Sequence, residues 1–273
     1  MRLTWLGWAG VELEAGDATV VIDPLGTPAA AFAAFGDRAA GTPLPEVVAA
    51  SKGRAVAGLV THLHRDHADA AALDAALAPG APIFEPPAGG GGDLEELALI
   101  HPDAELTATG RARRTFTPWQ SEVVGPFTIT AAPAVDGFGD PQTSWIVEAD
   151  GVRVLHLGDT MFHGHWWRIA LRAGPFDAVL LPVNGAVTRF PHRRPASPLP
   201  AVLDPEQAAI AAELLGARLA IPIHSEGYEI DGIYAPVAGA SAQFLAAAAT
   251  RGVNAQALEV GEAIELAAAP AAA

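Results

Sequence analysis

The stretch Thr61-His62-Leu63-His64-Arg65-Asp66-His67 places three imidazoles and one carboxylate within six residues. It follows an apolar run over 55–60 that is typical of a buried strand, and it precedes a helical pattern over 68–77. At the end of an extended strand, His62 and His64 would leave the backbone on one face. Imidazole and carboxylate groups suit zinc and, less strictly, iron or manganese. The stretch predicts a metal site at a strand end; a chance cluster of histidines in a polar loop is the alternative.

Composition narrows the possible ligands and partners. The 273 residues include no Cys, which excludes thiolate ligands, a thiolate nucleophile and a disulfide scaffold. The formal charge of -15 argues against nucleic-acid binding, which needs a surplus of Lys and Arg. We find neither a membrane span nor a signal peptide in the sequence. We therefore expect a cytoplasmic protein that acts on a small molecule, and this substrate can be anionic. The sequence leaves open whether the chain forms a homo-oligomer.

The order of patterns along the chain predicts its architecture. Hairpin-rich strands followed by alternating helices and strands occur twice, which favours an α/β fold with two mixed β-sheets face to face and helices on both outer faces. The length suits one domain, which we place at 1–266, with a frayed Ala-rich tail at 267–273. Within it we expect a short helix over 94–100 and a strand over 105–109.

Four motifs, in their order along the chain, resemble those of the metallo-β-lactamase superfamily. Its H-x-H-x-D-H signature corresponds to His62–His67, and its G-D-T motif to Gly158-Asp159-Thr160. Ile22-Asp23-Pro24 is similar to the early I-D-P of the family, and Ile221-Pro222-Ile223-His224 to its last strand-end His. The resemblance implies the four-layer αββα sandwich of that superfamily. The spacing and the early hairpin are most similar to the lactonase-like (ascorbate-6-phosphate lactonase-like) branch.

The chain departs from the family pattern at one position. The family usually supplies another His in a segment like A-x-H-G, where this chain has Ala134-Val135-Asp136-Gly137. A carboxylate at 136 can still bind a metal ion, and its oxygen shifts the preference toward manganese or iron. The alternative is that Asp136 caps the turn at Gly137 and that the site holds only one tightly bound ion.

The resemblance implies a cofactor of two divalent metal ions, zinc or manganese, with iron also possible. The implied ligands are His62, His64 and Asp136 for one ion and Asp66, His67 and His224 for the other, with Asp159 between them. The implied activity is hydrolysis, in which a metal-bound hydroxide attacks a lactone or amide carbonyl or a phosphoester. Asp66 and Asp159 are the predicted catalytic residues, and Asp66 can also accept a proton.

Two other functions stay open at this point. One is a non-hydrolytic enzyme of the same fold, such as a lyase or an oxidative biosynthetic enzyme. The other is a metal-binding protein without activity, in which the site has degenerated at Asp136.

Three histidines near the G-D-T motif have different predicted roles. His163 and His165, together with Trp166, are candidates to line the pocket mouth; a helix start with the Trp in the core is the alternative. His156 precedes Asp159 by three residues on one strand, so alternation turns it away from the metals, into the core.

The long Pro-rich loop over 185–203 contains His192 and Arg193. Basic groups above a metal site would suit a phosphate- or carboxylate-bearing substrate, because guanidinium pairs with such groups through two hydrogen bonds. We therefore predict that both residues bind substrate, with a solvated loop as the alternative.

Overall fold

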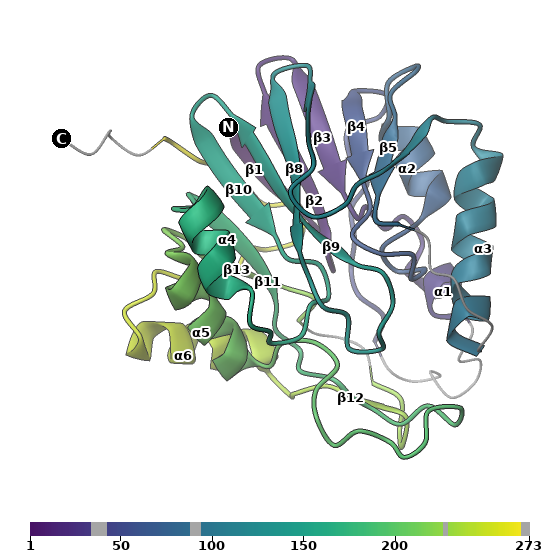
Figure 1. Ribbon diagram of the computed structural model, residues 1–273, viewed down its shortest axis with the longest axis vertical. Helices are drawn as coiled ribbons and strands as arrows, with labels where there is room; N and C mark the ends of the chain where they lie inside the picture. The colour runs from purple at the N-terminus through teal and green to yellow at the C-terminus, as the bar shows by residue number, and fades with distance from the viewer. Residues whose placement is uncertain (34–42, 88–93, 226–228, 269–273) are drawn as a thin grey trace.

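The computed structural model describes residues 1–33, 43–87, 94–225 and 229–268. Two β-sheets pack face to face, and helices cover their outer faces (Figure 1). This is the αββα arrangement that the sequence predicts. Residues 269–273 of the predicted tail lie outside the described residues.

The first sheet has seven strands among the described residues, in the order β15-β1-β2-β3-β4-β5-β6. Its first part is an antiparallel meander, and β3, β4, β5 and β6 run parallel. The strands are β1 (Arg2–Gly7), β2 (Gly10–Ala15), β3 (Ala18–Ile22), β4 (Ala55–Leu59), β5 (Ile83–Glu85), β6 (Arg113–Thr115) and β15 (Ala263–Glu265).

The second sheet has the order β13-β11-β10-β9-β8-β7 in the described part of the chain. Strands β7 to β10 pair antiparallel, whereas β10, β11 and β13 run parallel. The strands are β7 (Ser121–Val124), β8 (Phe127–Pro133), β9 (Thr143–Ala149), β10 (Val152–His156), β11 (Ala178–Pro182) and β13 (Ala220–Ile223). A separate two-stranded ribbon joins β12 (Val187–Thr188) to β14 (Tyr234–Ala235).

Helices form the outer layers (Figure 1). On the side of the first sheet lie α1 (Pro28–Ala31), α2 (Ala70–Ala76) and α3 (Leu94–Ala108), and on the side of the second lie α4 (Trp166–Ala173), α5 (Pro205–Leu215) and α6 (Ala240–Thr250). Each side buries its own apolar cluster, with Leu73 of α2 in one and Ile169 of α4 in the other. Among the described residues, we find no helix with the length and apolar character that a bilayer crossing requires.

The central core lies between the two sheets. Leu13 and Leu59 from the first sheet meet Trp145 and Val154 from the second, and all four side chains are fully buried. The indole Nε1 of Trp145 donates to the carbonyl of Val60 at 3.0 Å. This bond joins the second sheet to the segment that leads into the histidine-rich stretch.

One prediction for the first outer layer is wrong. Residues 94–108 form a single helix, α3, where we expected a short helix and then a strand over 105–109. Leu99 and Leu106 are both buried, and a separation of seven residues returns to the same helix face. Their burial in the cluster of α2 stabilises the helical turn that includes Pro102.

Candidate metal centre

The histidine-rich stretch is a turn, because β4 already ends at Leu59. The backbone N–H groups of His67 and Ala68 both donate to the carbonyl of His64, at 3.0 and 2.9 Å. The extended geometry that we predicted for His62 and His64 is therefore wrong. Their side chains nevertheless converge, with His62 Nε2 2.9 Å from His64 Nδ1.

The second sheet brings the other candidates to the same end of the sandwich. Asp136 follows β8, Asp159 follows β10 and His224 follows β13. Because β10, β11 and β13 are parallel, their carboxyl ends share one edge. An antiparallel bridge between Asp136 and Thr160 joins the end of β8 to this edge.

The seven predicted ligand residues gather in two groups, and within each group the ligand atoms lie within 4.8 Å of one another. The groups are His62, His64 and Asp136, and Asp66, His67, Asp159 and His224. The rings of His62 and His67 have centroids 4.2 Å apart, so the two groups adjoin. Asp159 belongs to the second group.

The second group has ligand atoms that converge, and some of them are buried without a hydrogen bond. His224 Nε2 lies 3.0 Å from Asp159 Oδ2, and His67 Nε2 lies 3.3 Å from Asp159 Oδ1. His67 Nε2 and Asp159 Oδ1 are buried and have no hydrogen-bond partner. Buried polar atoms are costly unless they are bonded. Imidazole nitrogens and carboxylate oxygens directed at one point fit a divalent cation.

The two carboxylates of the second group also suit a cation. Burial alone raises the pKa of Asp66 and Asp159, but His67 and His224 outweigh it and hold both carboxyl pKa values well below the usual range. Burial lowers the pKa of His67 and His224, but the carboxylates outweigh it and raise both pKa values. The two carboxylates are therefore held in their anionic form.

The first group is less strongly charged. Burial, reinforced by His67 and His64, lowers the pKa of His62 well below its usual range. Burial raises the pKa of Asp136 to about 6. The neutral imidazole that metal binding requires is thus the favoured form of His62.

Asp23 fixes the orientation of His67. The Nδ1 of His67 lies 2.8 Å from Asp23 Oδ2, and Asp23 also accepts hydrogen bonds from the N–H and hydroxyl of Thr61 at 2.8 and 2.6 Å. A carboxylate at Nδ1 places the imidazole proton there and leaves Nε2 free to bind a metal. Sequence analysis singled out the I-D-P motif but did not assign this role.

Trp8 is a residue that sequence analysis missed. Its indole Nε1 donates to Asp66 Oδ2 at 2.9 Å, and its carbonyl accepts from the N–H of His224 at 3.0 Å. Trp8, Asp23 and His224 have positive φ angles of 51°, 44° and 48°. This backbone region is uncommon for residues other than Gly, and such strain gathers at functional sites. The turn between β1 and β2 is the only signal in the sequence, and it does not reveal these contacts.

Comparisons with known proteins agree with this geometry. Residues 18–225 match the family model described as the beta-lactamase superfamily domain. A protein of Methanoculleus marisnigri named UPF0173 metal-dependent hydrolase is 30% identical over 234 residues, which cover 84% of this chain and 82% of the relative. The chain belongs to the metallo-β-lactamase superfamily. A relative of the same name from Sulfurisphaera tokodaii is 28% identical and covers 97% of this chain and 99% of its own length. Like these relatives, this member of the superfamily is a metal-dependent hydrolase.

Solved structures confirm the metallo-β-lactamase fold. Igni18, a metallo hydrolase from Ignicoccus hospitalis, has a TM-score of 0.64 at 21% identity and covers 96% of this chain and 97% of its own. An isothiocyanate hydrolase from Delia radicum gut bacteria has a TM-score of 0.66 at 18% identity, over 98% of this chain and all of its own. CmlA, a diiron β-hydroxylase from Streptomyces venezuelae, has a TM-score of 0.67 at 17% identity, over 97% of this chain and 54% of its own.

His156 lies in neither ligand group. It is fully buried, its Nε2 lies 2.8 Å from the carbonyl of Ala9, and its Nδ1 accepts from the N–H of Gly158. These contacts agree with the predicted core position in this superfamily member.

The candidates after the G-D-T motif are half-buried or buried. The ring of His163 stacks on Trp166 with centroids 3.8 Å apart, and its Nδ1 accepts from the N–H of His165. Trp166, the first residue of α4, is fully buried in the core cluster of the second sheet, which argues against direct contact with a substrate. Substrate binding by His163 and His165 stays a prediction.

The 185–203 segment lies against the loop that carries Asp136. The Nη1 of Arg193 donates to the carbonyl of Phe138 at 2.8 Å, and its guanidinium lies over the ring of Phe138. The ring of Phe138 is 5.9 Å from that of His64. The segment is thus next to the first ligand group, and substrate binding by His192 and Arg193 stays a prediction.

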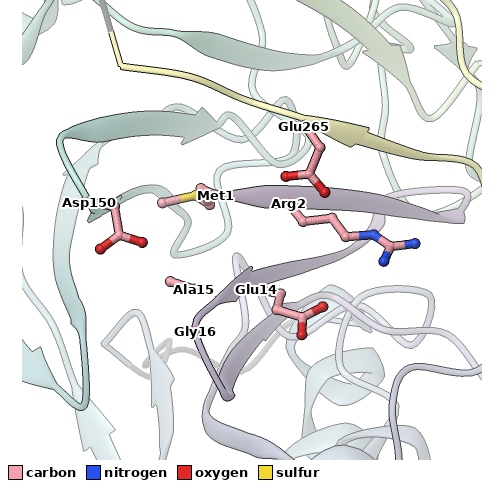
Figure 2. Close-up of a pocket in the computed structure, with 7 residues that line it drawn as sticks. All are labelled: Met1, Arg2, Glu14, Ala15, Gly16, Asp150 and Glu265. Atoms are coloured by element: carbon pink, nitrogen blue, oxygen red, sulfur yellow. The ribbon is translucent and has the colours of Figure 1, made fainter.

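A separate cavity of about 280 Å³ lies at the opposite end of the sandwich (Figure 2). Its lining includes Arg2 at the start of β1, Glu14 and Gly16 at the turn between β2 and β3, and Asp150 at the turn between β9 and β10. It contains none of the predicted site residues.

Proposed function

We propose that this hydrolase uses two divalent metal ions, one in each ligand group, to hydrolyse a small molecule. The observation that carries the proposal is the adjacency of the two groups, whose His62 and His67 rings are in contact. Unpartnered donor atoms in the second group support it further. Asp159, with its two oxygens directed at different histidines, is our candidate for the bridging ligand.

Divalent cations bound there would polarise a carbonyl or phosphoryl oxygen and lower the pKa of bound water toward about 7. The chain's own contribution is to orient the donors and to move a proton. Asp66 is the more exposed carboxylate of the second group, with 18% of its side chain exposed against 10% for Asp159. We assign Asp66 as the proton acceptor, held in place by the indole N–H of Trp8.

The substrate class that we favour is a small ester with an anionic group. The lactonase-like resemblance supports a lactone, and the Arg193 guanidinium beside the first group suits a carboxylate or phosphate. The formal charge of -15 makes nucleic acid a poor substrate. We keep the cytoplasm as the proposed location.

Metal analysis tests the dinuclear site. The chain purified without added metal and then loaded with zinc or manganese should bind close to two ions, and Asp136→Ala should bind close to one while its circular dichroism is unchanged. The matched control is Asp17→Ala in the exposed turn between β2 and β3, which should still bind two. An unchanged metal count in Asp136→Ala would exclude Asp136 as a ligand, and one ion in the wild type would refute the dinuclear site.

A substrate screen tests the reaction. Chromogenic lactones, amides and phosphoesters should include at least one compound that the metal-loaded protein hydrolyses, and that Asp66→Asn hydrolyses at least tenfold more slowly. If the protein binds two ions and hydrolyses none of the compounds, a non-hydrolytic enzyme or a binding protein would be favoured.

Asp136 favours an oxidative enzyme as the second candidate. A carboxylate makes the first group richer in oxygen ligands, which shifts its preference toward iron or manganese. The fold supports both reactions, since its structural relatives include hydrolases and a diiron β-hydroxylase. Oxygen consumption by the iron-loaded protein in the presence of a reductant, absent from Asp136→Ala, would support this candidate over hydrolysis.

A further inference from the structure

Asp140 lies directly behind one of the candidate ligands. Its Oδ2 is 3.0 Å from His64 Nε2, and the Nδ1 on the other side of the same ring faces His62 Nε2 at 2.9 Å. Both side chains are mostly buried, with 18% of His64 and 12% of Asp140 exposed. The imidazole of His64 therefore lies between His62 of the first ligand group and a carboxylate that belongs to neither group.

This arrangement decides which nitrogen of His64 can bind a metal. A neutral imidazole has one N–H and one lone pair. An acceptor-only carboxylate at Nε2 holds the proton on that nitrogen and leaves the lone pair on Nδ1, the atom that faces His62. Carboxylates in this position orient metal-binding histidines and raise their basicity.

The backbone around Asp140 is tied to the neighbouring ligand. Asp136 Oδ1 accepts hydrogen bonds from the N–H groups of Phe138 and Asp140, at 2.6 and 3.2 Å. A Cβ on Gly137 would lie 2.2 Å from the carbonyl oxygen of Ala201, so the 185–203 segment holds this loop closely. One short loop thus supplies both a ligand and the carboxylate behind a second ligand.

We infer that Asp140 is a positioning residue, which orients His64 so that its Nδ1 binds the metal ion of the first group. The inference depends on the proposed function, in which that group holds an ion. It assigns Asp140 the role in the first group that Asp23 has beside His67 in the second. Asp140 does not itself coordinate the ion.

Zinc titration of the metal-free full-length chain, in competition with a chromogenic chelator, tests this role. Asp140→Ala should weaken the affinity of one of the two ions by about 10–100-fold and leave the other unchanged. Asp140→Asn keeps an oxygen that accepts from Nε2–H, so its loss should be clearly smaller. Asp17→Ala, which removes an exposed carboxylate from the turn between β2 and β3, is the control and should bind both ions as the wild type does.

A second readout follows the ring itself. In the zinc-loaded wild type, the Nε2–H proton of His64 should give a slowly exchanging proton resonance that Asp140→Ala lacks, while the melting temperatures of the two metal-free proteins stay alike. Wild-type affinities for both ions in Asp140→Ala would overturn the inference. Equal losses in the Ala and Asn variants would overturn it too, because an oxygen that accepts from Nε2–H would then not be enough to orient His64. If the wild type holds no ion in the first group, both this inference and the proposed dinuclear site fail.

Discussion

At the scale of single residues, the site depends on groups that the sequence did not mark as ligands. Asp23 and Asp140 each lie behind a histidine, and Trp8 donates to Asp66. These three residues explain why the imidazoles and the carboxylate are held in one orientation. Their contribution can be measured separately from that of the ligands.

Replacing Asp23 by Ala should weaken the second ion and the fold together. The change removes the acceptor for His67 Nδ1 and leaves the N–H of Thr61 buried without a partner. We expect zinc affinity to fall by about 10–100-fold, and the free energy of unfolding by about 1–3 kcal/mol. Chelator competition and urea denaturation measure the two effects.

The comparison variant for Asp23→Ala is Asp17→Ala, which removes a carboxylate from the exposed turn before β3 and should change neither quantity. A variant at position 23 with wild-type zinc affinity would show that His67 keeps its orientation without the carboxylate.

His163 predicts a dependence of stability on pH. Burial, with His165 beside it, lowers the pKa of His163 to about 4. Below the usual pKa of about 6.5, the unfolded chain takes up a proton that the folded chain does not. Folding stability should therefore fall as the pH falls from about 7 to about 4, and this group should add no further loss below that.

His163→Asn isolates this effect, because the amide oxygen can accept from the N–H of His165 and does not titrate. The difference in unfolding free energy between wild type and variant should change in favour of the variant as the pH falls from 7 to 4. A difference that is the same at both pH values would contradict the pKa assignment.

The candidate ligand residues were predictable because they belong to local sequence motifs. His62 to His67, Asp159 and His224 are identified by spacing and by their positions after strands, and the structure gathers them. Asp140 and Trp8 were not predictable, because their roles depend on contacts between segments 76 and 58 residues apart in the chain. No local pattern specifies such contacts.

At the scale of secondary-structure elements, the predictions were correct where the helix-cap residues and the hydrophobic periodicity indicate the same helix. The sequence Asp204-Pro205-Glu206 predicts a helix start, with Asp as N-cap and Pro in the first turn. Helix α5 does begin at Pro205, and Asp204 and Gln207 form a reciprocal capping box. The prediction failed at 105–109, where we expected a strand. There the burial of Leu99 and Leu106 on one face keeps α3 intact through Ala108.

The cap of α5 gives a prediction at this scale. Asp204→Ala removes the acceptor for the N–H of Gln207 and should lower the free energy of unfolding by about 0.5–2 kcal/mol. Gln207→Ala removes only the weaker reciprocal bond of 3.4 Å and should cost less. Urea denaturation of both variants tests the order, and a larger loss in Gln207→Ala would contradict it.

At the scale of the whole molecule, the two sheets meet at the ligand groups. The histidine-rich turn follows β4 of the first sheet, and Asp136, Asp159 and His224 follow strands of the second. An ion bound by the second group would therefore connect both sheets at one end, where Trp145 already joins them through Val60. Metal binding should stabilise the folded chain as a whole.

Removing the metal should lower the thermal midpoint. Ions present at about 100 times their dissociation constant stabilise a folded protein by about 2.7 kcal/mol. In a chain of this size that corresponds to a shift of several degrees. Thermal unfolding should show a lower midpoint after chelator treatment, and zinc or manganese should restore it. A midpoint indifferent to chelation, with loss of metal confirmed by elemental analysis, would show that the ions do not contribute to stability.

The distribution of the donors along the chain also sets the order of events during synthesis. Residues 62 to 67 leave the ribosome well before His224, which follows β13. A nascent chain interrupted before that point holds at most an incomplete set of donors. A complete second ligand group therefore requires a chain that has been synthesised through His224.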